Sequence, residues 1–284
     1  ELLYKGISLI ETYPNWNEDS ILIRDVWAGK STLARLLSTN KQYERALEEN
    51  HRVLSILLSS NILDELHPYH MDLSLTYGQI GNIYLENGNL PSAREYFIKA
   101  HELSLLCVED NQTIEARQYL AASYHDLADI SYAEGNLTNA LSYLSSQYDL
   151  LTVLADETRT LQDQRNLVLS CNERANVCLE LGAIEAAKTA AQESLNISER
   201  IAKKSSTVYD LRNLSISYDR LGNIYQSIGD IEQAQCYYIR SLSLCYKMLR
   251  ISNSIESRFS LSVAYDNLGG MWSLKGILSK ATVC

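Results

Sequence analysis

The sequence predicts an all-α protein, a solenoid of stacked antiparallel helix pairs, and three observations support this fold class. A short motif of aromatic, aliphatic and small residues recurs every 47 residues. Within each copy the apolar residues follow the spacing of an amphipathic helix. Every copy after the first also contains a glycine where the helical spacing is interrupted. Because one helix pair cannot bury its apolar face alone, neighbouring copies are expected to stack.

Three columns of small residues define the repeat. The pattern Tyr218-x-x-Leu221-Gly222-x-x-Tyr225 has a close copy at Tyr77-x-x-Ile80-Gly81-x-x-Tyr84 and a worn one at Cys171-x-x-Arg174-Ala175-x-x-Cys178. The first small column reads Ala34, Gly81, Ala128, Ala175, Gly222, Gly269, and the glycine column reads Gly88, Gly135, Gly182, Gly229, Gly276. A third column holds only alanine: Ala46, Ala93, Ala140, Ala187, Ala234, Ala281. Small residues at fixed positions predict that the two helices of a pair approach each other closely.

Each unit is expected to be a helical hairpin. In one unit Leu211, Leu214, Tyr218, Leu221 and Tyr225 lie along a single helical stripe. The following Gly229-Asp230 has equivalents at Gly88-Asn89 and Gly135-Asn136. Glycine takes the left-handed conformation that ends a helix, and Asp or Asn accepts the first hydrogen bonds of the next helix.

The expected elements follow in chain order. Residues 1–13 correspond to the end of a preceding second helix, and Pro14-Asn-Trp-Asn-Glu forms the turn into the first complete unit. Helices are predicted at 20–39, 42–60, 69–87, 90–107, 113–134, 137–155, 160–181, 184–203, 207–228, 231–251 and 256–275. Pro91 suits the first turn of its helix, where the missing N–H costs nothing.

The repeat resembles the tetratricopeptide repeat (TPR) family. Tyr77, Ile80-Gly81, Tyr84, Ala93, Phe97 and Ala100 fall at the spacing of that family. The unit departs from the family pattern because it has 47 residues instead of about 34 and lacks the terminal proline. The resemblance implies a right-handed superhelix in which the first helix of every unit lines a concave face.

The unbroken register predicts a single TPR-like array over residues 1–284. Residues 1–13 end a preceding repeat, repeats occupy about 20–66, 67–113, 114–160, 161–207 and 208–254, and a truncated repeat occupies 255–284. Neither end has the polar cap expected of a free-standing solenoid. We therefore expect a fragment of a longer protein with further domains in the same chain.

Composition favours a protein partner over nucleic acid or membrane. The formal net charge of −10 opposes phosphate binding. No apolar run approaches the roughly 20 residues of a membrane span, and no signal peptide opens the chain. The expected location is cytoplasmic, which fits six cysteines without a CxxC pair.

No cofactor, metal site or catalytic residue is expected. Gly29-Lys30-Ser31-Thr32 resembles the end of a phosphate-binding loop, but Arg24 stands where the motif needs its first glycine, and the segment fits a helical register. The five histidines are scattered and lack the spacing of metal ligands. We therefore predict that this segment is not an enzyme.

The exposed columns of the first helices are the candidate binding site for a protein or peptide. The residues expected to contact it are Asn82, His125, Asp129, Asn172, Asn176, Asp219, Arg220 and Asn223. Side-chain amides both donate and accept hydrogen bonds, so an asparagine ladder can hold a peptide backbone of any sequence. An alternative is that these asparagines bond only within their own helices. The clamp with which some relatives hold a C-terminal carboxylate needs lysines and an arginine, and the corresponding columns here are mostly neutral or acidic.

Two functions are compatible with these patterns. The first is a protein-protein interaction scaffold whose concave groove attracts a basic or polar segment. Across the second to sixth units the lining columns hold the acids Asp126, Asp129, Glu173, Asp219 and Asp266 against Arg220 alone. The second is a regulatory or sensor arm of a larger enzyme or effector whose catalytic domain lies outside this segment.

Overall fold

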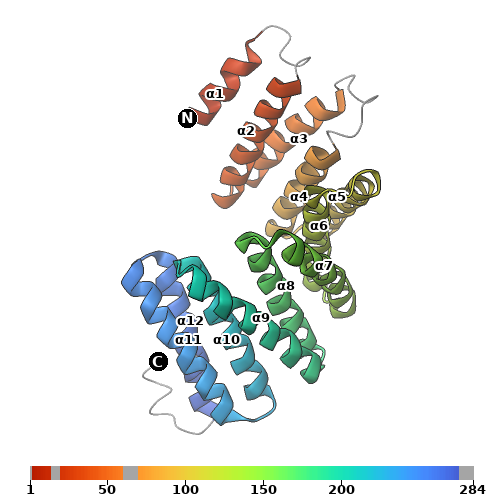
Figure 1. Ribbon diagram of the computed structural model, residues 1–284. Helices are drawn as coiled ribbons and strands as arrows, with labels where there is room; N and C mark the ends of the chain where they lie inside the picture. The colour runs from red at the N-terminus through yellow and green to blue at the C-terminus, as the bar shows by residue number, and fades with distance from the viewer. Residues whose placement is uncertain (1, 14–19, 60–69, 275–284) are drawn as a thin grey trace. The chain divides into compact units, whose positions relative to one another are not determined.

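The computed structural model describes residues 2–13, 20–59 and 70–274, and within these ranges the chain forms twelve α-helices and no strand. The helices are α1 (Leu2–Glu11), α2 (Ser20–Thr39), α3 (Tyr43–Ser59), α4 (His70–Glu86), α5 (Leu90–Asp110), α6 (Ile114–Ala133), α7 (Leu137–Thr158), α8 (Leu161–Glu180), α9 (Ile184–Lys204), α10 (Val208–Ser227), α11 (Ile231–Ile251) and α12 (Ile255–Leu274). They can be followed by label and colour in Figure 1. The all-α fold class is confirmed. The predicted turn at Pro14, together with Gly276 and Ala281, lies outside the described residues.

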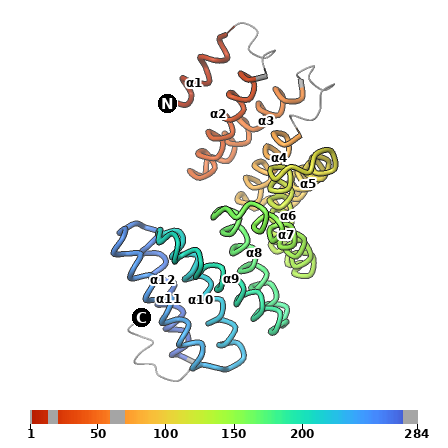
Figure 2. The backbone as a smooth tube through the Cα atoms, in the orientation of Figure 1, coloured from red at the N-terminus to blue at the C-terminus, as the bar shows by residue number. Residues whose placement is uncertain are grey.

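The chain divides into two compact units, residues 1–143 and 144–284. In the first unit, consecutive helices pack from α1 to α6, and α2, α4 and α6 also touch along the stack. In the second unit, consecutive helices pack from α8 to α12, and α8, α10 and α12 touch in the same way. Each unit therefore has the layout of a TPR-like solenoid, with antiparallel pairs whose first helices lie side by side. Figure 2 traces the chain through each unit. That both units belong to one array stays a prediction.

The turn between the two helices of a pair forms as the sequence predicts. Gly88 and Gly229 have φ angles of 78° and 81°, in the left-handed region. The Asn89 side chain then accepts a hydrogen bond from Ser92 N, and the Asp230 side chain accepts one from Gln233 N. Only residues 87–89 and 228–230 therefore separate the two helices of these pairs.

The predicted small columns mark the closest helix contacts. A Cβ atom built on Gly81 would lie 2.5 Å from ring carbons of Phe97, and one built on Gly222 would overlap the ring of Tyr238. The alanine column is completely buried at all five of its described positions, Ala46, Ala93, Ala140, Ala187 and Ala234. The large ring of one helix therefore occupies the space that the small residue of its partner leaves open.

Enlarging the alanine column should destabilise the protein. Ala187→Leu places extra methyl groups between α9 and its neighbours, and overpacking of this kind costs about 1 to 3 kcal/mol. Ala186→Leu is the control, because Ala186 lies on the exposed side of the same helix. Urea unfolding should show the loss for Ala187→Leu only. An equal effect of both variants would refute the assigned packing.

In the first hairpin, by contrast, a substitution at the turn should stabilise the protein. Lys41 occupies the glycine column and has a φ angle of 59°. A left-handed conformation costs a residue with a side chain about 1 to 2 kcal/mol, part of which glycine loses again through unfolded-state entropy. Lys41→Gly should therefore raise the free energy of unfolding by about 0.5 to 1 kcal/mol. Gly88→Ala should lower it, and an unchanged unfolding midpoint for both variants would contradict this explanation.

Candidate functional site

The predicted binding residues lie on the first helices of successive pairs, in two groups. Asn82, His125 and Asp129 belong to α4 and α6 in the first unit. Asn172, Asn176, Asp219, Arg220 and Asn223 belong to α8 and α10 in the second unit. In both units the helices concerned are in direct contact.

In the first unit a carboxyl group joins the two first helices. The side chain of Asn82, which is itself exposed, donates a hydrogen bond to the half-buried carboxyl group of Asp126. Gly78 provides the room, since a Cβ atom there would lie 3.3 Å from Asp126 Oδ2. His125 and Asp129 approach each other one helical turn apart, with 3.4 Å between Nδ1 and Oδ2. Asn82 thus bonds across the stack instead of within its own helix.

Burial changes the protonation of the Asp126 carboxyl group. It raises the pKa of Asp126 to about 7, helped by the nearby Asp129 carboxylate and opposed by His125 and the bond from Asn82. At neutral pH the Asp126 carboxyl group is therefore protonated about half of the time. A count of acidic residues overestimates the negative charge here.

In the second unit an arginine connects α8 and α10. Arg220 Nη1 donates to Asn176 Oδ1 at 2.7 Å, and Asn176 Nδ2 donates to Glu180 Oε1 at 2.8 Å. The asparagine amide uses both of its ends, one towards the neighbouring first helix and one within its own helix. The alternative that the asparagines bond only within their own helices does not hold for Asn176, because one of its two bonds crosses to α10.

The next residues of the ladder are anchored by the second helix of the pair. Tyr238 Oη in α11 lies 2.7 Å from Asn223 Oδ1 and 2.8 Å from Gln226 Oε1, and its single proton can be donated to either oxygen. Burial raises the pKa of Asp219 to about 6, against the effect of its bonds to Ser241 and Asn267 and of the charge on Arg220. Asp219 thus carries most of its charge at neutral pH.

One predicted residue lies in the interior. The Asn172 side chain is only 3% exposed, and its Oδ1 accepts a hydrogen bond from Ser194 Oγ at 2.8 Å. Asn172 in α8 therefore points towards α9, the helix that contains Ser194. Of the predicted residues in the second unit, Asn176, Asp219, Arg220 and Asn223 are therefore half-buried and only Asn172 is buried.

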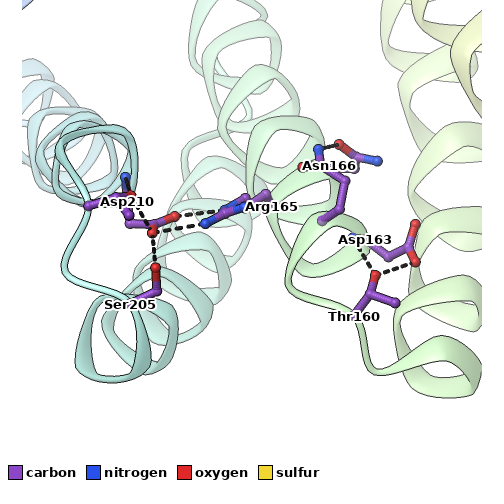
Figure 3. Close-up of polar contacts among 8 residues, drawn as sticks. Thr160, Asp163, Arg165, Asn166, Ser205 and Asp210 are labelled. Atoms are coloured by element: carbon purple, nitrogen blue, oxygen red, sulfur yellow. Dashed lines mark hydrogen bonds and ion pairs between the residues drawn. The ribbon is translucent and has the colours of Figure 1, made fainter.

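Sequence reasoning missed a charged contact between repeats. Arg165 in α8 donates twice to Asp210 in α10, from Nε to Oδ1 at 2.7 Å and from Nη2 to Oδ2 at 3.0 Å. Asp210 also accepts from Ser205 and Thr207 (Figure 3). Burial alone would raise the pKa of Asp210, but these donors lower it. The pattern Thr207-x-x-Asp210, a helix-start signal, could have identified the acid but not its arginine partner.

The resemblance to a phosphate-binding loop has a structural explanation. Gly29, Lys30 and Ser31 lie inside α2, and the Lys30 ammonium group is 2.9 Å from Glu11 Oε1 and 3.6 Å from Glu49 Oε2. The segment is helical as expected, and its lysine already has two carboxylate partners.

The described part of the chain gives little indication of a reactive thiol, a metal site or a membrane-spanning helix. Cys107, Cys171, Cys178 and Cys245 are buried thiols, and burial raises the pKa of Cys171 to about 12. Within the described ranges no three His, Cys, Asp or Glu residues are placed to hold a metal ion. Nor is any described helix both long enough and apolar enough to span a membrane.

Comparisons with known proteins agree with this fold. The family model described as "Tetratricopeptide repeat" matches residues 75–105 and 216–247. No curated protein matches the chain significantly.

Three solved structures are similar to the chain. BtubC (BKLC) from P. vanneervenii has 19% identity and a TM-score of 0.59, with 86% of this chain and 85% of that chain covered. The apo form of RapI has 12% identity and a TM-score of 0.60, with 90% and 93% covered. A Signal Transduction ATPase with Numerous Domains (STAND) protein with a tetratricopeptide repeat sensor, from Pyrococcus horikoshii, has 17% identity and a TM-score of 0.60. Its match covers 99% of this chain and 40% of that chain.

The raised pKa of Asp126 predicts a pH-dependent stability. Between its ordinary value of 3.8 and about 7, the folded protein holds a proton that the unfolded chain releases, so stability falls as pH rises through this interval. Asp126→Asn cannot titrate and should gain stability relative to the parent between pH 5 and pH 7. The gain is on the order of 1 kcal/mol, because solvent screens a half-buried group. Urea unfolding at both pH values is the measurement, with the exposed Asp25→Asn as control. A parallel pH profile in parent and variant would contradict it.

Proposed function

Because this chain carries tetratricopeptide repeats and folds as TPR-like stacks of helix pairs, we propose that it is a protein-protein interaction scaffold. We propose further that a partner segment lies along the first helices and that the segment is basic or polar. The observation that carries this proposal is the presence of amide side chains at or near the surface of first helices in each of the two units. Asn82, Asn176 and Asn223 hold donors and acceptors at or near the surface, where they can be exchanged for the backbone groups of a peptide.

Charge supports a basic segment. Asp129 and Glu173 are half-buried and Asp266 is exposed on the lining columns, where Arg220 is the single Lys or Arg from the second repeat onwards. A surface of one sign attracts ligands of the opposite sign and speeds their encounter. A lysine or arginine placed beside Asp126 would also lower the pKa of that carboxyl group, so binding of a basic segment should release a proton near pH 7.

We propose that the site binds and does not catalyse. Asn176 is bonded to Arg220 and Asn223 to Tyr238, and none of the three asparagines can act as a nucleophile or a general base. We also propose a cytoplasmic location, no cofactor, and further domains in the same chain.

A second function is suggested by one structural neighbour. The STAND protein with a tetratricopeptide repeat sensor aligns with nearly all of this chain over 40% of its own length. On that basis the segment is alternatively a regulatory or sensor arm of a larger enzyme or effector. The complete reading frame distinguishes the two, because a catalytic domain beyond either end favours the arm.

The amide ladder can be tested with a partner captured from the native organism. One Asn→Ala change should weaken binding modestly, since a hydrogen bond of this kind contributes about 0.5 to 1.5 kcal/mol net. The triple variant Asn82→Ala, Asn176→Ala, Asn223→Ala should weaken binding severely, and the affinity of the parent should fall as salt rises. Isothermal titration calorimetry measures both.

Control variants separate binding from folding. Asn139→Ala and Asn196→Ala remove exposed amides from the second helices α7 and α9 and should leave affinity unchanged. Circular dichroism checks that each variant is folded. A triple variant that is folded and binds the partner as tightly as the parent would refute the proposed site.

A further inference from the structure

A cavity of about 340 Å³ lies in the second unit, where the last turns of α7 and α9 meet the first turns of α8. Its walls include Asp156, Arg159, Gln164, Leu167, Arg200 and Lys204. The volume is within the range of pockets that hold small ligands or single side chains. None of these residues belongs to the amide ladder, so the cavity is a separate feature.

The cavity is basic in an acidic protein. Three cations, Arg159, Arg200 and Lys204, line it against one carboxylate, although the chain as a whole has a net charge of −10. Among the described residues, none of these three cations forms an ion pair. Arg165, close by in the sequence, is different, because Asp210 binds its guanidinium group through two hydrogen bonds (Figure 3). The cavity therefore has donors that the protein itself does not use.

The backbone places Arg159 in an uncommon conformation. Its φ angle is 53°, which residues with a side chain rarely adopt. The helices α5, α9 and α11 end at residues 110, 204 and 251 of the 47-residue register, whereas α7 continues one residue further, to Thr158. The corresponding cap residues Ser205 and Ser252 are extended, with φ angles of −141° and −148°. The repeat thus does not require the left-handed loop that brings Arg159 to the cavity.

The cations occur at one level of the repeat. One register step later, the three positions hold Ser206, Lys247 and Ile251, and one step earlier they hold Gln112, Val153 and Glu157. Columns that serve stacking recur, as the alanine column does. Packing of the helices therefore does not explain why three cations meet at this cavity.

We propose that this cavity binds an anionic group on a segment of a partner protein, either a carboxylate or a phosphate monoester. The guanidinium groups of Arg159 and Arg200 offer planar sets of N–H donors that match both anions, and Lys204 adds a point charge. Leu167 supplies an apolar wall for the carbon stem that carries the anion. The cavity therefore favours an anionic group, whereas the first helices favour a basic segment.

The test uses three fluorescent peptides that differ at one central residue, which is phosphoserine, glutamate or glutamine. The phosphoserine and glutamate peptides should bind the parent protein, and the glutamine peptide should bind at least about tenfold more weakly. Preference for phosphoserine over glutamate assigns the phosphate source, and equal binding assigns the carboxylate. Equal binding of the glutamine peptide would overturn the proposal, as would tighter binding of a single-stranded oligonucleotide.

Variants locate the site. Arg200→Ala with Lys204→Ala should weaken binding of the anionic peptides about tenfold, since two exposed charges are lost. The matched control, Lys247→Ala with Arg250→Ala, removes two exposed cations from α11 and should leave affinity unchanged. Arg159→Gly removes a guanidinium group from a position whose φ angle suits glycine, so it should weaken binding without loss of stability. Equal losses in the cavity and control variants would refute the site.

Discussion

The fold depends on the close approach of the two helices in each pair. Phe97 lies against Gly81 and Tyr238 lies against Gly222 without room for even one additional carbon. Burial of such a ring contributes far more than the hydrogen bond of its hydroxyl group, because aromatic side chains bury large areas. Once the pair is closed, its first helix presents a fixed face to the next pair. The amide ladder and the bond between Arg165 and Asp210 both rest on that spacing.

Much of the fold could be predicted because residues of similar size and type recur at fixed positions of the 47-residue repeat. The glycine column predicts the left-handed turns, and Gly88, Gly135, Gly182 and Gly229 all have positive φ angles. The buried alanines follow from their register in the same way. Lys41 shows the limit of the pattern, since the turn forms there although the glycine is absent. Some helix ends escaped prediction, as at α7, which ends at Thr158 instead of residue 155.

The helices that carry the candidate site residues could be predicted, but the hydrogen bonds, burial and charge of these residues could not. Register places Asn82, Asn176 and Asn223 on the first helices, yet nothing in the sequence says that Asn176 bonds to Arg220 or that Tyr238 bonds to Asn223. Asn172 was expected at the surface and is buried. Adjacent residues of a helix point to different sides, so an error of one residue in the register exchanges a surface position for a buried one. The charge of Asp126 depends on its burial, which a count of residues cannot provide. The basic cavity was missed because its cations come from two separate elements, α9 and the loop after α7, and do not recur together in any other repeat.

The polar bonds between first helices have a consequence for how the chain folds and opens. Arg24 reaches Asp72, Trp27 reaches Thr76 and Ser38 reaches Glu86, while Arg165 reaches Asp210 and Asn176 reaches Arg220, each joining residues 44 to 49 positions apart. Each bond therefore closes a loop of about one repeat, so the entropy of closure stays small at every level. A chain with such local contacts can start to fold at any repeat and add neighbours in turn. When a force pulls on the two ends of such a chain, we expect the helix pairs to unfold one at a time and to refold when the force is released.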